Sequence, residues 1–253
     1  MLADAIRSAA VILAARRLSG QPGPLLAGGL EPLTVEDALD IQRDVSEMLG
    51  NSVAGWKCGM PGDGRVSVAP IYASTVFDAS PCPVWVREGQ VRAEPELAFV
   101  FAEGLPPRER PYSRDEVLLA VSKVHLALEL IDSRFYADAK PPFLQSLADG
   151  LVNQGLLLGP AVNITHALTA GKLAIRVQQG TRDEELAGVH PAGDPLAPLL
   201  WLVEFLRQRG QGLLPGQAVI TGSYAGVVNL QPDVPASLQF GALGELRALF
   251  HNR

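Results

Sequence analysis

The stretch Ala93-Glu94-Pro95-Glu96-Leu97-Ala98-Phe99-Val100-Phe101 is an apolar run that carries acidic side chains at alternate positions. This pattern predicts a strand over residues 92–101, in which successive side chains point to opposite faces of the sheet. Glu94 and Glu96 then point to the same face. Because Pro95 has no N–H group to donate within a sheet, we expect the strand to lie at a sheet edge or beside a bulge.

Two carboxylates beside an apolar run repel each other and are costly to bury. A divalent cation removes both costs, and oxygen ligands suit Mg²⁺, Mn²⁺ or Ca²⁺. The alternative is that both glutamates face water on a half-exposed strand, as alternating polar residues commonly do in antiparallel sheets. The spacing alone favours this alternative.

A third acidic residue, Glu129, lies within the apolar stretch that runs from Leu126 to Ile131. A lone charge in such surroundings needs either a partner or a metal ion. The partner could be Arg134 or Lys123, in a structural ion pair. Three acidic residues in apolar settings together make a metal site as well supported as the structural alternatives.

Lys57 lies in Gly55-Trp56-Lys57-Cys58-Gly59, where two glycines permit close approach of the backbone to a ligand. The lysine could bind a carboxylate, or transfer protons if its pKa is lowered. Taken alone, the pattern favours a lysine whose amine reaches solvent from the end of a strand. Similarly, Thr221-Gly222-Ser223 could hold an anionic group or form an ordinary turn. His190, before Pro191, favours a structural role over a catalytic one.

Hydrophobic periodicity and turn residues predict the order of helices and strands. We expect helices over residues 2–18, 35–49, 113–123 and 195–209, and strands over residues 53–58, 92–101, 124–131, 155–159, 173–178, 217–222 and 236–249. Capping signals precede three helices: Thr34 with Asp37, Ser113 with Glu116, and Asp194 as N-cap with Pro195 as the first helical residue. Many strands with few helices favour a mixed α+β domain over a doubly wound sheet.

The 253 residues are 47% hydrophobic and 19% charged, which indicates a folded chain with one sizeable core. The formal net charge is -6 and no Lys/Arg-rich run occurs, so we expect no nucleic-acid partner. No apolar run is long enough to span a bilayer, and the charged N-terminal stretch does not resemble a signal peptide. Cys58 and Cys82 make no disulfide framework. We therefore expect a cytoplasmic protein with reduced thiols and no membrane partner.

Several motifs occur in the order that one family shows: Gly55-Trp56-Lys57, Ala69-Pro70-Ile71, Glu94-Pro95-Glu96-Leu97-Ala98-Phe99, Glu129-Leu130-Ile131-Asp132-Ser133-Arg134, His190-Pro191, Trp201-Leu202, Gly216 and Thr221-Gly222-Ser223. With them, the chain resembles the 2-keto-4-pentenoate hydratase / 4-oxalocrotonate decarboxylase family of the fumarylacetoacetate hydrolase superfamily over residues 35–250. The ordered set is far more specific than any one motif.

The resemblance implies a fumarylacetoacetate hydrolase type of fold, in which a mixed β-roll catalytic domain follows an N-terminal helical region. We accordingly expect a mainly helical region over residues 1–75, which includes the start of the active-site turn. A mixed-β, metal-binding catalytic domain is expected over residues 76–253. The family also implies a homo-oligomer, by analogy alone.

The resemblance also implies a metal ion, Mg²⁺ or Mn²⁺, held by three glutamates: Glu94, Glu96 and Glu129. Lys57 is placed in the pocket and is the first candidate for proton transfer, with Asp149 the second. Arg134 and Ser223 are candidates for positioning the substrate.

The function implied is hydration of a small unsaturated 2-oxo acid, of the type that converts 2-hydroxypenta-2,4-dienoate to 4-hydroxy-2-oxopentanoate. A bound metal would polarise the 2-oxo group and stabilise the negative charge that develops on it. The implied pathway is the catabolism of aromatic compounds.

Three alternatives stay open. A 4-oxalocrotonate-type decarboxylase would use the same site and release CO₂. A hydrolase of carbon–carbon bonds would need a Glu–His pair to activate water, and only His125 is near one of the glutamates. A non-catalytic, small-acid-binding protein is the third. Its support is Ala148-Asp149-Gly150-Leu151-Val152-Asn153-Gln154, which retains the aspartate of the family's Ala-Asp-Asn-Ala-Ser type of segment but not its asparagine and serines.

Overall fold

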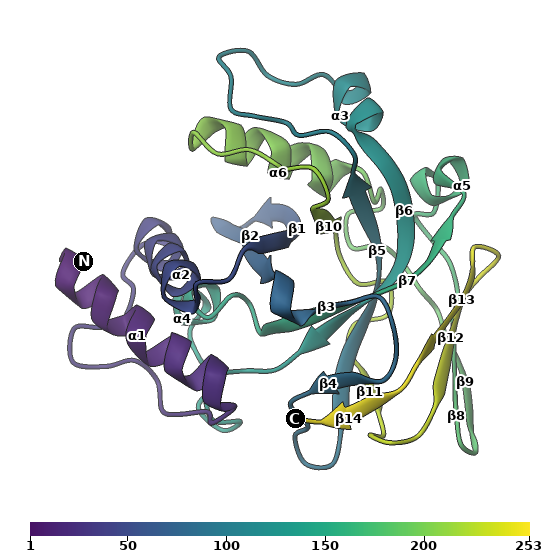
Figure 1. Cartoon of the computed structure of the whole chain (residues 1–253), viewed down its shortest axis with the longest axis horizontal. Coiled ribbons are helices and arrows are strands. Elements are labelled where there is room, and N and C mark those ends of the chain that lie inside the picture. The colour runs from purple at the N-terminus through teal and green to yellow at the C-terminus, as the bar shows by residue number, and fades with distance from the viewer.

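The computed structural model, drawn in Figure 1, describes residues 1–253. The helices are α1 (Ala3–Ser19), α2 (Val35–Leu49), α3 (Arg114–Ala120), α4 (Phe143–Ala148), α5 (Ile164–Leu168) and α6 (Ala197–Gln208), with one 3-10 helix, η1 (Ala73–Thr75). The strands are β1 (Val53–Gly62), β2 (Arg65–Tyr72), β3 (Val76–Phe77), β4 (Cys82–Val84), β5 (Val91–Phe101), β6 (Val121–Ile131), β7 (Asn153–Val162), β8 (Ile175–Gln179), β9 (Arg182–Leu186), β10 (Ala218–Ile220), β11 (Val228–Leu230), β12 (Ala236–Phe240), β13 (Gly244–Ala248) and β14 (Phe250–Asn252). This composition confirms the predicted α+β class.

The main sheet has eight strands. Seven of them follow the order β2-β1-β10-β5-β6-β7-β3, and β11 pairs with β5 beyond the end of β10. The sheet is mixed, because β1 with β10 and β3 with β7 are parallel whereas the other neighbours are antiparallel. A second sheet, β13-β12-β8-β9, is wholly antiparallel. This arrangement excludes a doubly wound parallel sheet, as the sequence predicted.

The N-terminal helices pack on each other and on α4. The side of α1 that they bury is made of small and aliphatic residues: Ile6, Ala9, Ala10, Leu13 and Ala14. These residues belong to a hydrophobic cluster distinct from the larger core around β5 and β6. Figure 1 shows α1, α2 and α4 together at one side of the molecule, away from β8, β9, β12 and β13.

None of the helices combines the length and the hydrophobicity that crossing a bilayer requires.

Two of the predicted helix starts are confirmed by their capping boxes, Thr34 with Asp37 and Ser113 with Glu116. The helix predicted over 113–123 nevertheless ends at Ala120, because Val121 already belongs to β6. The sequence missed this boundary since apolar residues continue without a break from helix into strand.

Two other predicted elements need correction. The helix expected over 195–209 begins at Ala197, and Asp194 is not its N-cap. The Asp194 carboxylate instead accepts a hydrogen bond from the Leu196 N–H at 2.8 Å, which closes a turn ahead of the helix. The strand expected over 236–249 is a hairpin of β12 and β13, in which Gly241 turns the chain with a left-handed φ of 47°.

We expected Pro95 at a sheet edge or beside a bulge. The strand β5 lies inside the main sheet, so the edge position was wrong, and the β5–β6 ladder has no register shift at Pro95. The strand pairs with β6 from Arg92 to Phe101, whereas its other side pairs with β10 only over Ala98–Val100 and with β11 only over Val91–Ala93. The Pro95 carbonyl accepts the Tyr224 N–H at 3.0 Å across the gap between β10 and β11. Since the N and O atoms of a strand residue point to the same side, the missing N–H of proline faces this gap.

Arg17 connects the N-terminal helices to the segment that precedes β7. Its guanidinium donates to the Asn153 carbonyl and to the Asp149 carbonyl, both at 2.9 Å, and lies over the ring of Tyr72. Burial of the guanidinium and, secondarily, the charge of Arg134 lower the pKa of Arg17 to about 10. The helix α1 is therefore held by directed polar bonds as well as by apolar packing.

Replacement of Arg17 by Met should lower the free energy of unfolding by about 2 kcal/mol, because charge-assisted bonds to buried carbonyls are lost. Urea denaturation measures this difference. Arg7 on the same helix is the matched control, since its side chain is 57% exposed and lies 3.8 Å from Glu47. Equal stability of the Arg17→Met and Arg7→Met variants would contradict the assignment.

Candidate metal site

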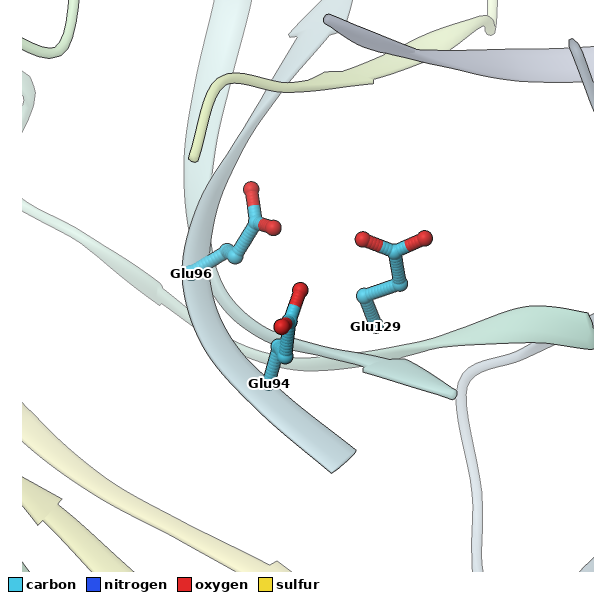
Figure 2. Close-up of side chains that lie close together, drawn as sticks. All are labelled: Glu94, Glu96 and Glu129. Atoms are coloured by element: carbon cyan, nitrogen blue, oxygen red, sulfur yellow. The ribbon is translucent and has the colours of Figure 1, made fainter. Parts of the chain in front are cut away.

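Three glutamates from two adjacent strands meet on one face of the main sheet. Glu94 on β5 is the direct cross-strand partner of Glu129 on β6, and Glu96 follows two residues along β5. One carboxylate oxygen from each lies within 4.8 Å of the other two, and Figure 2 shows the three side chains directed at a common space. The sequence correctly predicted that Glu94 and Glu96 share a face, because strand side chains alternate.

The carboxylates are largely out of water. Glu129 is 0% exposed and Glu96 is 2% exposed, whereas Glu94 is half-buried. Small and aliphatic residues of the same sheet form a cluster around them: Ile71, Ala98, Ala127, Leu156, Ala218 and Ile220. Burial and then the charge of Glu129 raise the pKa of Glu96 well above its ordinary value, and the same causes raise that of Glu94. The alternative that Glu94 and Glu96 both face water is thereby wrong for Glu96.

Lys57 is the ion-pair partner of Glu129, in place of the Arg134 or Lys123 considered from the sequence. Its Nζ lies 2.6 Å from Glu129 Oε1 and donates to the Leu151 carbonyl at 3.1 Å. Burial alone would lower the pKa of Lys57, but the nearby glutamates, Glu129 foremost, outweigh burial and raise it. The amine therefore carries a proton at neutral pH and is bound by Glu129 and Leu151, while 16% of the side chain remains exposed.

The remaining oxygens of the glutamates determine what the site can bind. Glu96 Oε2 accepts the Gly222 N–H at 2.7 Å. Glu129 Oε2 is buried and has no hydrogen-bond donor. Three hard carboxylate ligands, one with a buried and unpartnered oxygen, against a single ammonium group fit a divalent cation such as Mg²⁺ or Mn²⁺. A cation would also compensate the excess of negative charge.

Gly222 explains two motifs for which the sequence gave only general interpretations. Its φ of 134° suits glycine, and a Cβ there would lie 2.7 Å from the ring of Pro191. The turn after β10 thus packs on Pro191 and presents a backbone N–H to Glu96, whereas the sequence left open whether it would hold an anionic group or form an ordinary turn. His190 is buried and packs edge-on against Tyr224, and burial lowers its pKa. The structural interpretation of this histidine is supported.

Arg134 and Asp149 form a buried pair with each other. Arg134 Nε lies 2.5 Å from Asp149 Oδ1, and each side chain is 2% exposed. The Arg134 backbone N–H also donates to Asp149 Oδ2 at 3.2 Å. Ser223, next to Gly222, is half-buried and donates to the Gly226 carbonyl at 3.1 Å. The expected catalytic role of Asp149 and substrate-positioning roles of Arg134 and Ser223 stay predictions.

Asn153 is a partner of the site that the sequence did not identify. Its side-chain amide donates to Glu129 Oε1 at 2.9 Å. The available signal was a polar residue opening an otherwise apolar strand, but nothing in the spacing connected it to Glu129. The residues before it, Leu151 and Val152, adopt left-handed φ values of 51° and 59°. Such values are unusual for non-glycine residues and strained for a β-branched one.

The raised pKa of Glu96 predicts how stability depends on pH when a chelator keeps metal out. The folded chain retains this proton above the ordinary glutamate pKa of 4.5, so the wild type loses stability as pH rises through the folded-state pKa. Glu96→Gln removes that loss. It should exceed the wild type in free energy of unfolding at pH 8, and by less at pH 5.

Urea denaturation at both pH values checks this difference. Glu103→Gln, at an exposed position just after β5, is the control and should follow the wild type at both pH values. A Glu96→Gln variant that is less stable than the wild type at pH 8 would show that the carboxylate is not under electrostatic strain.

No sequence profile of a known protein family matches the chain. A 2-keto-4-pentenoate hydratase of Paraburkholderia xenovorans is 26% identical over 249 residues, which cover 92% of this chain and 90% of the relative. A 4-oxalocrotonate decarboxylase of a Pseudomonas species is 26% identical over 246 residues, which cover 90% of this chain and 91% of the relative.

Solved structures show the fold. A 4-oxalocrotonate decarboxylase from Pseudomonas putida G7, complexed with magnesium and adipate, superposes with a TM-score of 0.81 at 18% identity, over 99% of this chain and 98% of its own. A yeast protein of the fumarylacetoacetate hydrolase family superposes with a TM-score of 0.52 at 16% identity, over 78% and 92%. In sequence, this chain is therefore similar to 2-keto-4-pentenoate hydratases and 4-oxalocrotonate decarboxylases, and it shares its fold with solved structures of a 4-oxalocrotonate decarboxylase and of a fumarylacetoacetate hydrolase family protein.

Proposed function

We propose that this chain is a metal-dependent hydratase that adds water to a small unsaturated 2-oxo acid, as in the conversion of 2-hydroxypenta-2,4-dienoate to 4-hydroxy-2-oxopentanoate. The observation that carries the proposal is the buried cluster of Glu94, Glu96 and Glu129, whose oxygens lie within 4.8 Å of one another. Relatives named as hydratases align with nine-tenths of the chain. A site of this kind suits substrates whose reaction builds negative charge on oxygen.

In this proposal, Glu94, Glu96 and Glu129 hold Mg²⁺ or Mn²⁺. The cation, when bound, would polarise the 2-oxo group of the substrate and stabilise the charge that develops there. A solved relative with this fold was complexed with magnesium, which supports the choice of metal. Glu94 is only half-buried, whereas Glu96 and Glu129 are buried.

Lys57 is the proposed proton donor. The proposal rests on position, because the bonds to Glu129 and Leu151 hold Nζ beside the cluster. The nearby glutamates raise the pKa of Lys57, whereas proton transfer was expected from the sequence only if that pKa were lowered. General acid catalysis needs a protonated group in such a fixed position. Asp149 is the second candidate for proton transfer, and Arg134 and Ser223 are proposed to position the substrate.

The second candidate function is decarboxylation of a 4-oxalocrotonate type of substrate. It is favoured by relatives named 4-oxalocrotonate decarboxylase that match at the same identity as the hydratases. The same three glutamates and Lys57 would serve it, because loss of CO₂ also leaves negative charge on the 2-oxo group. Detection of CO₂ from 2-oxohex-3-enedioate distinguishes the two.

Several broader expectations are also proposals. The cytoplasm is the proposed location, a homo-oligomer the proposed state and the catabolism of aromatic compounds the proposed pathway. We further propose that the chain divides into a mainly helical region over residues 1–75 and a catalytic domain over residues 76–253. The strands β1 and β2 precede this boundary in the sequence and are hydrogen-bonded into the main sheet.

The activity assay follows loss of the dienol absorbance of 2-hydroxypenta-2,4-dienoate with Mg²⁺ or Mn²⁺, and again after chelation. We expect metal-dependent turnover that yields 4-hydroxy-2-oxopentanoate. Glu96→Gln should lower kcat/KM by more than the roughly 10- to 100-fold typical of losing a residue that merely supports a metal ligand.

The control for this assay is again Glu103→Gln, which makes the same chemical change at an exposed position and should retain full activity. Release of CO₂ without hydration would move the assignment to the decarboxylase. Bound metal with no turnover of either acid would count against both enzymes and favour a non-catalytic, small-acid-binding role.

A further inference from the structure

Asn153 lies at the start of β7 and is 1% exposed. Its Nδ2 donates to Glu129 Oε1 at 2.9 Å and to the Gly155 carbonyl at 3.2 Å, so both N–H groups of the amide are engaged. The reversed amide would place its carbonyl oxygen against two acceptors. The orientation of this side chain is therefore determined by its surroundings.

This orientation leaves two buried acceptors without donors, Asn153 Oδ1 and Glu129 Oε2. A buried acceptor without a partner opposes folding. An apolar side chain of similar size at position 153 would avoid one of these losses. The amide is thus better explained by what it does to Glu129 than by a contribution to stability.

Two donors converge on the same oxygen of Glu129. Lys57 Nζ lies 2.6 Å from Oε1, and Asn153 Nδ2 lies 2.9 Å from it. They come from β1 and β7, on opposite sides of the strand that carries Glu129. A carboxylate held in this way cannot rotate freely, and Oε2 is the oxygen left to bind a cation.

We propose that Asn153 is a positioning residue that fixes the Glu129 carboxylate, leaves Oε2 as the metal-binding oxygen and thereby strengthens cation binding. The inference rests on the proposed function, because it presumes that the three glutamates hold the metal.

The backbone before Asn153 supports this role. Leu151 and Val152 are held in strained left-handed conformations. Bonds on three successive carbonyls maintain them: Lys57 donates to Leu151, the Asp132 N–H donates to Val152 at 2.8 Å, and Arg17 donates to Asn153 at 2.9 Å. These strained residues immediately precede Asn153, whose side-chain amide donates to Glu129.

The test is the dissociation constant for Mn²⁺ measured by calorimetry, with the electron paramagnetic resonance spectrum of bound Mn²⁺ as a second readout. Asn153→Leu, which keeps the size but removes both donors, should weaken Mn²⁺ binding roughly 10- to 100-fold. Asn153→Ser, which can donate only one bond, should fall between Asn153→Leu and the wild type. The spectrum should change in both variants, since a ligand carboxylate is released from its fixed orientation.

The matched control is Gln154→Leu. Gln154 is the next buried amide, and its side chain bonds only to the backbone of Trp85 and Ile131. This variant should have a lower Tm and an Mn²⁺ affinity within twofold of the wild type. Asn153→Leu should show the reverse, a large loss of affinity with a smaller change in the Tm of the metal-free protein.

The possible outcomes distinguish failure of the positioning role of Asn153 from failure of the proposed metal site. If Mn²⁺ binds the wild type, Glu96→Gln abolishes binding and Asn153→Leu leaves it unchanged, the positioning role is wrong and the metal site stands. If the wild type does not bind Mn²⁺, both are wrong. If Asn153→Leu does not fold, Asn153→Ser decides: unchanged affinity and spectrum overturn the inference.

Discussion

Three carboxylates share a buried face of the main sheet with a single ammonium group, and the site depends on this imbalance of charge. Lys57 compensates one of the three charges, at 2.6 Å from Glu129. In surroundings of low dielectric, the others must be met by protons or by a cation. Side-chain rotation offers limited relief, since Glu94 and Glu129 are direct partners in the β5–β6 ladder. The backbone thus imposes a charge cluster that a divalent cation stabilises.

Elements outside the main sheet support this cluster, namely the N-terminal helices and the segment that precedes β7. Arg17 of α1 bonds the carbonyls at both ends of the segment between Asp149 and Asn153. The ion pair between Arg134 and Asp149 also anchors this segment, at its Asp149 end, to the chain that follows β6. Apolar packing alone would not specify its unusual backbone. The altered sequence of this segment is therefore compatible with an ordered metal site, which weakens the non-catalytic alternative.

Part of the structure follows from local rules that the sequence displays. The alternation of Glu94 and Glu96 on one strand predicted their common face, and capping residues located the starts of α2 and α3. The pairing of Lys57 with Glu129 did not follow from such rules. Their strands are separated by β10 and β5, and only the order of the complete sheet brings the two side chains together.

The errors have the same origin. Pro95 indicated a sheet edge or a bulge because it cannot donate within a ladder, but an interior strand accommodates it where β10 stops short of β11. Asn153 was overlooked because its donor faces Glu129 only after Leu151 and Val152 take left-handed conformations that no sequence preference favours. Long-range pairing determined both outcomes, and composition and spacing do not encode it directly.

The most direct test of the three-glutamate metal site is a crystal structure of the protein grown with Mn²⁺, with an anomalous difference map calculated at the manganese absorption edge. We expect one strong peak among the carboxylates of Glu94, Glu96 and Glu129, within about 2.0–2.3 Å of an oxygen of each, as hard divalent cations bind oxygen. Glu129 Oε2 should be the contacting oxygen. The absence of a peak at this cluster, in crystals whose solution contains saturating Mn²⁺, would show that the three glutamates do not form a metal site.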